Sequence, residues 1–444
     1  MTSSQRLFGT DGVRGLANGD VLTPELALAV AASAATLLTD AGQARPHVVL
    51  GRDPRPSGEM LEAAAVAGFT SAGCDVTLLG VVPTPAVAHA TADTGAPLGL
   101  MISASHNPAA DNGLKLFGAG GWKLPDDVED AVAAGLRSAR RCTGAAVGRV
   151  LPDGGAQRER YVGHLRAAVP TDLGGLRVVV DCAQGAASDL APRVYREAGA
   201  EVVAVAADAD GYRINERCGA THLETLQAAV REAGADLGLA HDGDADRCLA
   251  VDAAGEVVDG DQLLALLAVA LHERGELADD TVVATVMSNL GFVRAMEQAG
   301  IGVVQTAVGD RYVLEALRKR GLSLGGEQSG HTVQLRHATT GDGLLTGLAV
   351  LGRLAETGRS LADLAAVMTR LPQVLVNVRA GRSRAQADDV RAAVAREEEA
   401  LAGTGRVLLR PSGTEPLVRV MVEAETPERA RDVAERLAAV VGAD

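Results

Sequence analysis

The sequence predicts an α/β fold with three α/β domains of related plan and a smaller α+β C-terminal domain. Three stretches of the chain repeat the order strand, polar loop, amphipathic helix, strand. Their strands are continuous apolar runs, typical of a sheet covered on both faces, whereas the last strands alternate with a period of two. The 444 residues suffice for roughly three or four such domains.

The three repeats define the predicted sheet domains. HVVLGRDPRPSG (47–58), LRVVVDCAQGAAS (176–188) and TVVATVMSNL (281–290) each begin with an apolar strand, and a helix and a second strand follow within about thirty residues. Strand-helix-strand units of this length favour parallel pairing. In the second helix the apolar positions have helical spacing; they are Ala187, Leu190, Ala191, Val194, Tyr195 and Ala198.

The C-terminal segment differs from the repeats. A charged helix near 385–402 separates VLVNVRA from GRVLLRPSG, and in LVRVMVEA the valines 418, 420 and 422 alternate with Arg419, Met421 and Glu423. That alternation predicts a half-exposed antiparallel strand. Thr426 and Pro427 predict the start of a last helix. The predicted domains span 1–150, 151–255, 256–368 and 369–444.

Composition and charge narrow the class of protein. Hydrophobic residues make up 47% of the chain and aromatic residues only 2%, so the cores must consist of Ala, Val and Leu. A net charge of −15 disfavours nucleic acid and anionic membranes as partners. Five scattered cysteines without a C-x-x-C pair favour a reducing compartment over a disulfide framework. With no long apolar run and no signal-like start, a cytoplasmic protein is expected.

Ser105 stands in a polar loop, ISASHNPAADNG (102–113), directly after the apolar run APLGLM. Asn-Pro and Asn-Gly are turn signals, so one interpretation is that Ser105 is a turn residue. A serine can instead act as a nucleophile or as a phosphate carrier, and a phosphoserine would bring about −1.5 to −2 charges. The carrier hypothesis therefore requires a counter-ion and donors nearby.

Three aspartates could supply that counter-ion. In LGLAHDGDADRCLAVD (237–252), Asp242, Asp244 and Asp246 alternate, so their carboxylates can turn to one side. Without a cation, repulsion would raise their pKa values or disorder the loop. An oxygen-only set suits a hard divalent ion, and Arg247 and Ala253 exclude the EF-hand pattern. We expect Mg²⁺ with open positions for a phosphate oxygen; the alternative is a solvated acidic turn.

A third loop, GGEQSGH (325–331), follows the strand-like GLSL. Its side chains offer donors and acceptors of several kinds, a set that suits the hydroxyl groups of a sugar. The alternative is a turn at a strand end. The candidate residues are Glu327, Gln328, Ser329 and His331.

A fourth loop, RPSGTEP (410–416), combines an arginine, two hydroxyls and a glycine in a tight turn. Such a loop can direct backbone N–H groups and a guanidinium at one phosphate, and the alternative is an ordinary hairpin turn. The candidate residues are Arg410, Ser412, Gly413, Thr414 and Arg419 on the next strand.

Several basic residues follow strands or glycine-rich turns and are either site residues or plain surface residues. They are Arg14 in FGTDGVRG, Arg52 and Arg55 in GRDPRPSG, Lys115 in NGLKLF and Arg311 in VGDRYV. The chain has neither a G-x-x-x-x-G-K-[ST] nor a G-x-G-x-x-G motif, so nucleotide-binding folds of those kinds are not indicated.

Taken together, the four loops resemble those of the α-D-phosphohexomutase superfamily, in the same order and over essentially the whole chain. SASHNP resembles the phosphoserine loop, DGDADR the metal loop, GEQSGH the sugar loop and RPSGTEP the phosphate loop. The opening LFGTDGVRG and Gln328 resemble the bacterial branch that acts on glucosamine phosphates. Two departures from that branch, Ala-Ala at 109–110 and RINERCGATH at 213–222, touch no predicted reacting group.

The resemblance implies a cytoplasmic isomerase that interconverts glucosamine 6-phosphate and glucosamine 1-phosphate through a phosphoserine at Ser105 and a sugar 1,6-bisphosphate. The resemblance also implies that this reaction feeds UDP-N-acetylglucosamine and cell-wall synthesis, and that three mixed α/β domains surround a central cleft beside the smaller fourth domain. It implies Mg²⁺ bound by Asp242, Asp244, Asp246 and the oxygen of Ser105. It also implies catalytic roles for Lys115 in proton transfer, Arg14 in charge stabilisation and His106 beside the phosphoserine.

The remaining implied residues bind substrate: Arg247, Arg311, the residues of the third and fourth loops, and Arg419. The implied partners are small sugar phosphates, with no nucleic acid and no membrane, and a homodimer is allowed for. A mobile fourth domain is expected to let the bisphosphate turn over. Rival hypotheses are an enzyme for mannose or glucose phosphates, a magnesium-dependent phosphatase, and an inactive metal- or sugar-binding protein.

Overall fold

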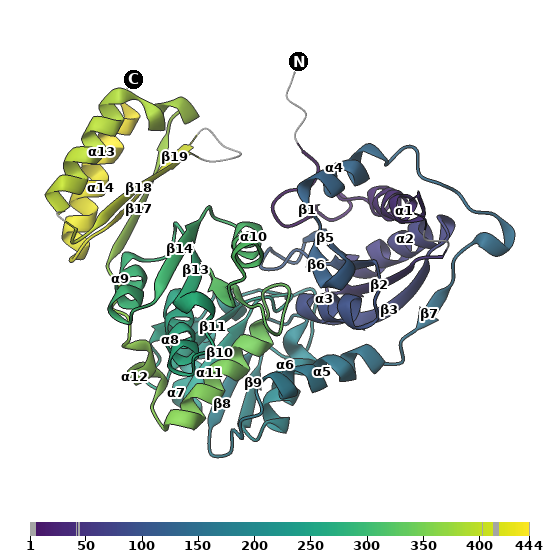
Figure 1. The fold of residues 1–444 in the computed structure, drawn as a ribbon, viewed down its shortest axis with the longest axis horizontal. Helices are drawn as coiled ribbons and strands as arrows, with labels where there is room; N and C mark the ends of the chain where they lie inside the picture. The colour runs from purple at the N-terminus through teal and green to yellow at the C-terminus, as the bar shows by residue number, and fades with distance from the viewer. Residues whose placement is uncertain (1–5, 41, 43–44, 402, 412–416, 444) are drawn as a thin grey trace. The chain divides into compact units, whose positions relative to one another are not determined.

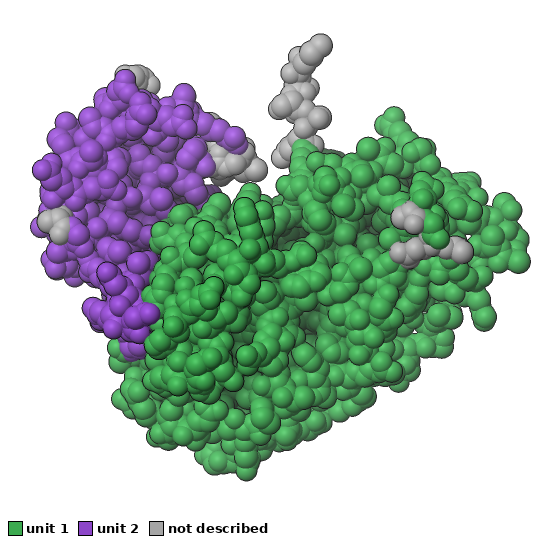
Figure 2. All heavy atoms as spheres, in the orientation of Figure 1, with its two compact units in different colours: residues 1–287, 301–366 green, residues 288–300, 367–444 purple. Residues whose placement is uncertain are grey.

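The computed structural model describes residues 6–40, 42, 45–401, 403–411 and 417–443. The chain forms two compact units (Figure 2): unit 1 comprises 1–287 and 301–366, and unit 2 comprises 288–300 and 367–444. In the described residues, unit 1 holds sheets of seven, five and four strands, and unit 2 holds a sheet of three strands (Figure 1). The mixed α/β architecture with a smaller C-terminal part is therefore confirmed; the four exact domain boundaries stay a prediction.

The first sheet is mixed and has the order β1-β5-β4-β2-β3-β7, with β6 paired to β5. Its middle strands β2, β3, β4 and the edge strand β7 run parallel, whereas β1, β5 and β6 add antiparallel pairs. The strand bounds are β1 Val13–Leu16, β2 His47–Arg52, β3 Asp75–Val81, β4 Leu98–Ile102, β5 Asp111–Gly118, β6 Trp122–Lys123 and β7 Val150–Pro152. The helices of this region are α1 Pro24–Asp40, α2 Ser57–Ser71, α3 Thr84–Asp93 and α4 Asp126–Ala134.

The second sheet has the order β12-β11-β10-β8-β9. The strands β8, β9 and β10 are parallel, and β11 returns antiparallel to β10. The bounds are β8 Arg177–Asp181, β9 Glu201–Val205, β10 Leu237–His241, β11 Cys248–Asp252 and β12 Val257–Val258, with helices α5 Ala156–Ala168, α6 Ala187–Glu197 and α7 Glu224–Ala233. All six residues with helical spacing around α6 are buried, as the sequence predicted.

The third sheet has the order β14-β13-β15-β16. The strands β13, β14 and β15 are parallel, and β16 is antiparallel to β15. The strand bounds are β13 Thr281–Thr285, β14 Gly302–Thr306, β15 Leu324–Gly326 and β16 Thr332–Gln334. The helices of unit 1 in this part are α8 Gly260–Glu273, α10 Asp310–Arg320, α11 Gly343–Thr357 and α12 Leu361–Ala365. All three predicted strand-helix-strand repeats are confirmed, each with a parallel pair.

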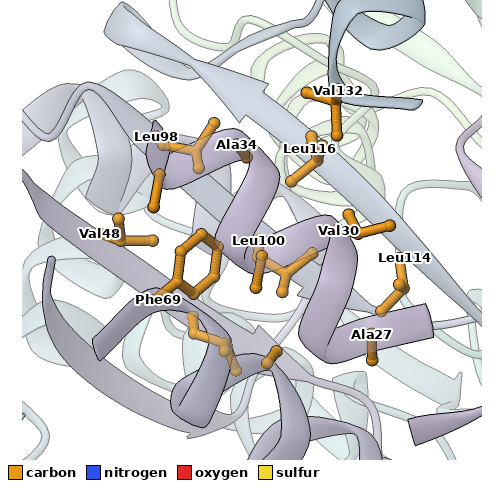
Figure 3. Close-up of a cluster of buried hydrophobic side chains, with 14 of the residues drawn as sticks. Ala27, Val30, Ala34, Val48, Phe69, Leu98, Leu100, Leu114, Leu116 and Val132 are labelled. Atoms are coloured by element: carbon orange, nitrogen blue, oxygen red, sulfur yellow. The ribbon is translucent and has the colours of Figure 1, made fainter. Parts of the chain in front are cut away.

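The core of the first sheet is built from small and branched aliphatic side chains. Figure 3 shows α1 and α2 residues such as Ala34 and Phe69 packed against the sheet residues Val48, Leu98 and Leu100. Each of these five side chains is at most 3% exposed. Close packing of Ala, Val and Leu therefore replaces aromatic bulk, as expected for a chain with so few aromatic residues.

Unit 2 contains an antiparallel sheet of order β17-β19-β18. The strands are β17 Gln373–Arg379, β18 Arg406–Pro411 and β19 Leu417–Glu423, and the helices are α9 Leu290–Gln298, α13 Asp388–Leu401 and α14 Pro427–Gly442. The predicted start of the last helix is confirmed, because the side chain of Thr426 accepts from the backbone N–H of Arg429 and Pro427 is the first helical residue.

The prediction that β19 is half-exposed was wrong for its second half. Met421 and Glu423 are buried together with the valines. At this end of the strand the Glu423 carboxylate accepts from the backbone N–H of Leu290, the first residue of α9, at 2.8 Å. It also accepts from Arg406 Nε on the neighbouring strand β18 at 2.7 Å. A segment distant in the sequence therefore provides the second layer, which periodicity alone does not indicate.

In the described part of the chain, none of the helices is both long and apolar enough to cross a membrane.

Candidate active site

Three of the four predicted loops occupy the same topological position. Each joins a parallel strand to its antiparallel neighbour: β4 to β5, β10 to β11 and β15 to β16. In sheets of this kind, ligands gather at the carboxyl ends of the parallel strands. These loops and the N-terminal segment line a cavity of about 420 Å³ in unit 1, whose lining includes Arg14, His106, Asp246, Arg247, Glu327 and His331.

Ser105 is fully buried and is not itself one of the residues that line this cavity, but its neighbour His106 is. Its backbone has a φ of 53°, in the left-handed region that non-glycine residues rarely adopt. Its Oγ donates a hydrogen bond to Asp242 Oδ2 at 2.6 Å and lies 3.3 Å from His106 Nδ1. The structure thus brings the candidate carrier hydroxyl into direct contact with the first of the three aspartates.

The carboxylates of Asp242, Asp244 and Asp246 form one buried cluster, with one oxygen of each within 4.8 Å of the others. Two further oxygens, Asp244 Oδ1 and Asp246 Oδ1, are buried and have no hydrogen-bond partner among the described residues. Buried polar atoms ordinarily find a partner. An all-oxygen set with unsatisfied acceptors fits a hard divalent cation such as Mg²⁺.

The protein shifts the pKa values of two of these carboxyl groups in opposite directions. Burial, together with the charges of Asp246 and Asp244, raises the pKa of Asp242 well above its usual range. Burial also opposes ionisation of Asp244, but the Lys115 ammonium and a hydrogen bond from Thr84 lower the pKa of that carboxyl. The negative charge of the cluster is therefore only partly neutralised by cationic side chains of the protein.

Lys115 is the main internal counter-charge. It lies on β5 with its Nζ 2.7 Å from Asp244 Oδ2, 3.4 Å from Asp246 Oδ2 and 2.9 Å from Asp11 Oδ2. Burial alone would lower the pKa of Lys115, but the three carboxylates raise it above its usual value. Arg14, on β1, forms an ion pair with the same Asp11 and lines the cavity. The two candidate catalytic cations are thus held together by one aspartate.

His106 and Arg247 lie on either side of the serine and the carboxylates. Burial, aided by the charges of Arg247 and Arg14, lowers the pKa of His106 to about 4, so its ring is neutral at physiological pH. The Nε of Arg247 lies 3.9 Å from Asp242 Oδ2 and 3.8 Å from Asp246 Oδ1 and has no hydrogen-bond partner among the described residues. Its guanidinium can therefore bind an incoming anion at the edge of the cluster.

The loop between β15 and β16 contributes two of its four candidates to the cavity lining. Glu327 lines the cavity and accepts from the backbone N–H of Gly309 at 2.9 Å, and His331 lines it as well. The side chain of Gln328 instead donates to Asp259 Oδ2 at 3.4 Å, and Ser329 is absent from the lining. Here the structure separates the candidates into a pair that faces the cavity and a pair that does not.

Arg311 is placed differently from the other candidates. Its guanidinium forms ion pairs with Asp126 and, at 2.8 Å, with Glu129, both on α4. It lines a cavity of about 610 Å³ beside Trp122 and Tyr312 rather than the cavity of about 420 Å³ that His106 and Arg247 line. In this arrangement its charge is already neutralised by carboxylates.

The candidates of the fourth loop belong to unit 2. Arg410 on β18 and Arg419 on β19 are directly opposite partners in the antiparallel register. Burial and the charge of Arg419 lower the pKa of Arg410. Two like charges placed opposite each other are unfavourable without an anion between or beside them. Ser412, Gly413 and Thr414 lie outside the described residues.

Three residues of the site were missed by the sequence reasoning. Asp11 stands in the FGTDGVRG motif three residues before Arg14, and its carboxylate lies 2.9 Å from Nζ of the buried Lys115. Thr84 donates to Asp244 Oδ2 at 2.5 Å, and Asn215 Nδ2 donates to the carbonyl oxygen of Ser105 at 2.9 Å. Asn215 belongs to the RINERCGATH segment, which therefore does touch the backbone of the serine loop.

Family models match nearly the whole chain in four consecutive parts. They describe the α/β/α domains I, II and III and the C-terminal domain of phosphoglucomutase/phosphomannomutase, at residues 5–141, 159–255, 259–371 and 375–440.

Full-length relatives are similar at high identity. A phosphoglucosamine mutase of Parafrankia sp. (strain EAN1pec) is 65% identical, and the alignment covers 98% of this chain and 98% of the relative. A phosphoglucosamine mutase of Saccharopolyspora erythraea is 64% identical, with 99% of each chain covered.

Solved structures agree with this fold. A phosphoglucomutase/phosphomannomutase family protein from Burkholderia thailandensis has a TM-score of 0.82 at 25% identity, with 99% of each chain covered. An Aspergillus fumigatus N-acetylphosphoglucosamine mutase, solved with GlcNAc-6P and magnesium, has a TM-score of 0.66 at 21% identity and covers 98% of this chain and 95% of its own. The chain belongs to the phosphoglucomutase/phosphomannomutase family of phosphohexomutase enzymes.

Proposed function

We propose that this enzyme is a phosphoglucosamine mutase that interconverts glucosamine 6-phosphate and glucosamine 1-phosphate, with Ser105 as the phosphoryl carrier. The observation that carries the proposal is the 2.6 Å contact between Ser105 Oγ and a carboxylate of the buried aspartate cluster. The substrate assignment is supported by the relatives that carry this name at 61–65% identity over nearly their full length.

The reaction proceeds in two phosphoryl transfers. In the first, the O1 hydroxyl of glucosamine 6-phosphate attacks the phosphorus of phosphoserine 105, the bond from phosphorus to Oγ breaks, and a 1,6-bisphosphate forms. The bisphosphate turns over, and Oγ of Ser105 then attacks the 6-phosphoryl group and releases glucosamine 1-phosphate. Such transfers depend on in-line positioning and on neutralised charge more than on covalent help from the protein.

Asp242, Asp244 and Asp246, with an oxygen of the phosphoserine, would hold Mg²⁺. When bound, the ion neutralises negative charge on the transferring group. The unsatisfied oxygens of Asp244 and Asp246 support this assignment. Arg247 and the neutral His106 bind the phosphoserine from the cavity side, and Arg14 adds positive charge there.

Lys115 moves the proton. In the first transfer its ammonium donates a proton to the departing Ser105 oxygen and recovers one from the attacking O1 hydroxyl, so that protons balance over the step. Arginine is a poor base at neutral pH, which assigns the charge role to Arg14. The raised pKa of Lys115 supports an ammonium, rather than an amine, at the start of this sequence.

The remaining candidate residues are assigned to substrate binding. Glu327 and His331 contact the sugar. Arg410 and Arg419, which are opposite partners in the strand register, bind the phosphate that is not reacting, together with Ser412, Gly413 and Thr414. Arg311 and Gln328 join the substrate only if their side chains leave the partners described above, whereas Ser329 Oγ is buried without a hydrogen-bond partner among the described residues. The cytoplasmic location, the homodimer and the mobile fourth domain remain predictions.

The experiment is a turnover assay of the Ser105→Ala variant with glucosamine 6-phosphate, Mg²⁺ and a catalytic amount of the 1,6-bisphosphate. We expect loss of isomerisation by more than about 10³-fold with an unchanged melting temperature. Persistent isomerisation would refute the carrier role. Equal or faster wild-type turnover of glucose 1-phosphate would overturn the glucosamine assignment, and excess inorganic phosphate would indicate a phosphatase.

A further inference from the structure

Arg55 is a fully buried arginine beneath the Ser105 loop. It belongs to the loop between β2 and α2, and its Nε donates to Asp53 Oδ2 at 2.9 Å; Asp53 is also fully buried. A buried guanidinium is costly unless every N–H finds an acceptor. The acceptors of its N–H groups therefore indicate the role of Arg55.

The remaining N–H groups of Arg55 all point at backbone carbonyls of the serine loop. Nη2 donates to the carbonyl oxygens of Ser105 at 2.9 Å and Asn107 at 2.8 Å. Nη1 donates to the carbonyl oxygen of Asp111 at 2.9 Å and to that of Pro108. One planar group therefore binds four carbonyls within seven residues of the chain, a geometry that only the arginine fork provides.

Asn215 supports the same point of the loop from the second sheet domain. Its Nδ2 donates to the carbonyl oxygens of Ser105 at 2.9 Å and Asn107 at 3.0 Å. Ser105 has a φ of 53°, and a left-handed backbone is energetically unfavourable for a non-glycine residue. Two buried donors on one carbonyl offset that cost and hold the peptide plane that follows Ser105.

The peptide that precedes Ser105 is held by the same network. Ser103 Oγ donates to Asp53 Oδ2 at 2.6 Å and accepts from the backbone N–H of Ser105 at 2.9 Å. Asp53 in turn is bound by Arg55. Both peptide groups that flank Ser105 are thus connected to a single guanidinium, one directly and one through Asp53 and Ser103.

We propose that Arg55 is a positioning residue that holds the backbone of Ser105 so that Oγ stays directed at the aspartate cluster during both phosphoryl transfers. This inference rests on the proposed function. The serine must present its oxygen in line to two different ends of a sugar bisphosphate, and a misplacement of about 1 Å can cost on the order of 10²-fold in rate. Arg55 is fully buried and does not line the cavity, so substrate binding should not depend on it.

The test is the Arg55→Lys variant, which keeps the charge beside Asp53 but cannot bind four carbonyls. We expect kcat to fall about 10- to 100-fold while KM for glucosamine 6-phosphate stays within about twofold. The matched control is Arg52→Lys in the same segment. Its guanidinium pairs with Glu59 at 3.4 Å and Glu62 at 3.3 Å and donates to the carbonyl oxygen of Asp53 at 3.5 Å, but among the described residues it forms no hydrogen bond with residues 103–111. It should retain wild-type kcat.

The assay must separate positioning from stability. Single-turnover transfer from phosphorylated enzyme to sugar is measured well below the melting temperature and normalised to the phosphoserine content found by mass spectrometry. A purely structural role would lower the melting temperature and leave this normalised rate unchanged; that result would overturn the inference.

If Arg55→Lys does not fold, two milder variants test whether the network positions Ser105. Asn215→Ala and Ser103→Ala each remove one part of the network, and each should lower the normalised transfer rate with KM unchanged. Wild-type rates in both would refute the positioning role. Isomerisation by the wild-type enzyme is scored separately, so failure of the inference and failure of the proposed function give different results.

Discussion

At the residue scale, the site is defined by where charges lie relative to Ser105. Asp242 accepts a hydrogen bond from the Ser105 hydroxyl, Lys115 forms an ion pair with Asp244, and Arg247 lies 3.8 to 3.9 Å from the nearest carboxylate oxygens of the cluster. Three carboxylates with one close ammonium leave an excess of negative charge in a buried place. That excess of negative charge favours the binding of a cation to the cluster.

The Asp242→Asn variant tests this electrostatic argument. In the absence of Mg²⁺ the variant should be at least as stable as the wild type, because it removes a carboxylate whose pKa is raised by burial and by its two acidic neighbours. Mg²⁺ at about 100 times its Kd should stabilise the wild type by about 2.7 kcal/mol and the variant much less. Thermal unfolding with and without Mg²⁺ is the measurement. The control, Asp189→Asn on the exposed face of α6, should respond to Mg²⁺ like the wild type.

His89 allows a prediction of pH dependence away from the site. It lies on α3 with its ring centroid 4.7 Å from that of His164, and burial followed by the His164 charge lowers its pKa to about 4. In the unfolded chain the pKa of histidine is about 6.5. The unfolded state therefore binds more protons between these two values, and stability contributed by neutral His89 is lost as the pH falls from about 6.5 to 4.

The measurement is urea unfolding of the wild type and His89→Gln at several pH values. Because His89 is partly exposed, the wild type should lose only about 1 to 2 kcal/mol more than the variant across this window. Parallel stability profiles for the two proteins would contradict the assignment.

At the element scale, the site depends on hairpin loops that press against one another. The metal loop between β10 and β11 approaches the serine loop so closely that a Cβ on Gly243 would lie 2.5 Å from the carbonyl oxygen of Ser105. That is far below van der Waals contact, so only glycine permits the approach. The close contact places the aspartates of one hairpin against the serine of another.

Gly243→Ala is therefore expected to push the two loops apart. We predict at least about a 10²-fold loss of kcat, since small displacements of reacting groups have large effects on rate. Steady-state kinetics of the mutase reaction is the measurement. Gly163→Ala in α5, where an added Cβ meets nothing within 4 Å, is the matched control and should leave kcat unchanged. Wild-type activity of Gly243→Ala would show that the loops need not approach this closely.

At the scale of the whole molecule, buried ion pairs connect the first and third sheet domains within unit 1. Lys123 on β6 forms ion pairs with Asp11 of the N-terminal segment and with Asp310 at the start of α10, and its side chain is only 10% exposed. Asp11 also binds Lys115 and Arg14. The contact that joins two domains thus also orients the candidate catalytic cations.

Lys123→Met should destabilise unit 1 by about 3 to 5 kcal/mol, because it leaves buried carboxylates without their counter-charge. Chemical denaturation monitored by circular dichroism measures the loss. Lys319→Met, on the exposed face of α10, should change stability by no more than about 0.5 kcal/mol. Equal effects of the two substitutions would exclude a structural role for the buried lysine.

Local patterns in the chain were enough to predict the three strand-helix-strand repeats, the antiparallel C-terminal sheet, the Thr426 cap and the loops that carry Ser105 and the three aspartates. Period, capping and turn chemistry act over a few residues, so the sequence displays them directly. Long-range contacts decided the rest: the burial of Glu423 by α9, the pairing of Arg311 with α4, and the roles of Asp11, Arg55 and Asn215. These contacts join residues that are between 50 and 182 positions apart in the sequence, such as Arg55 with Ser105 and Arg311 with Glu129. A buried charge is stable only beside a partner of opposite charge or a hydrogen-bonding partner. Local sequence patterns do not identify a partner that is so far away along the chain.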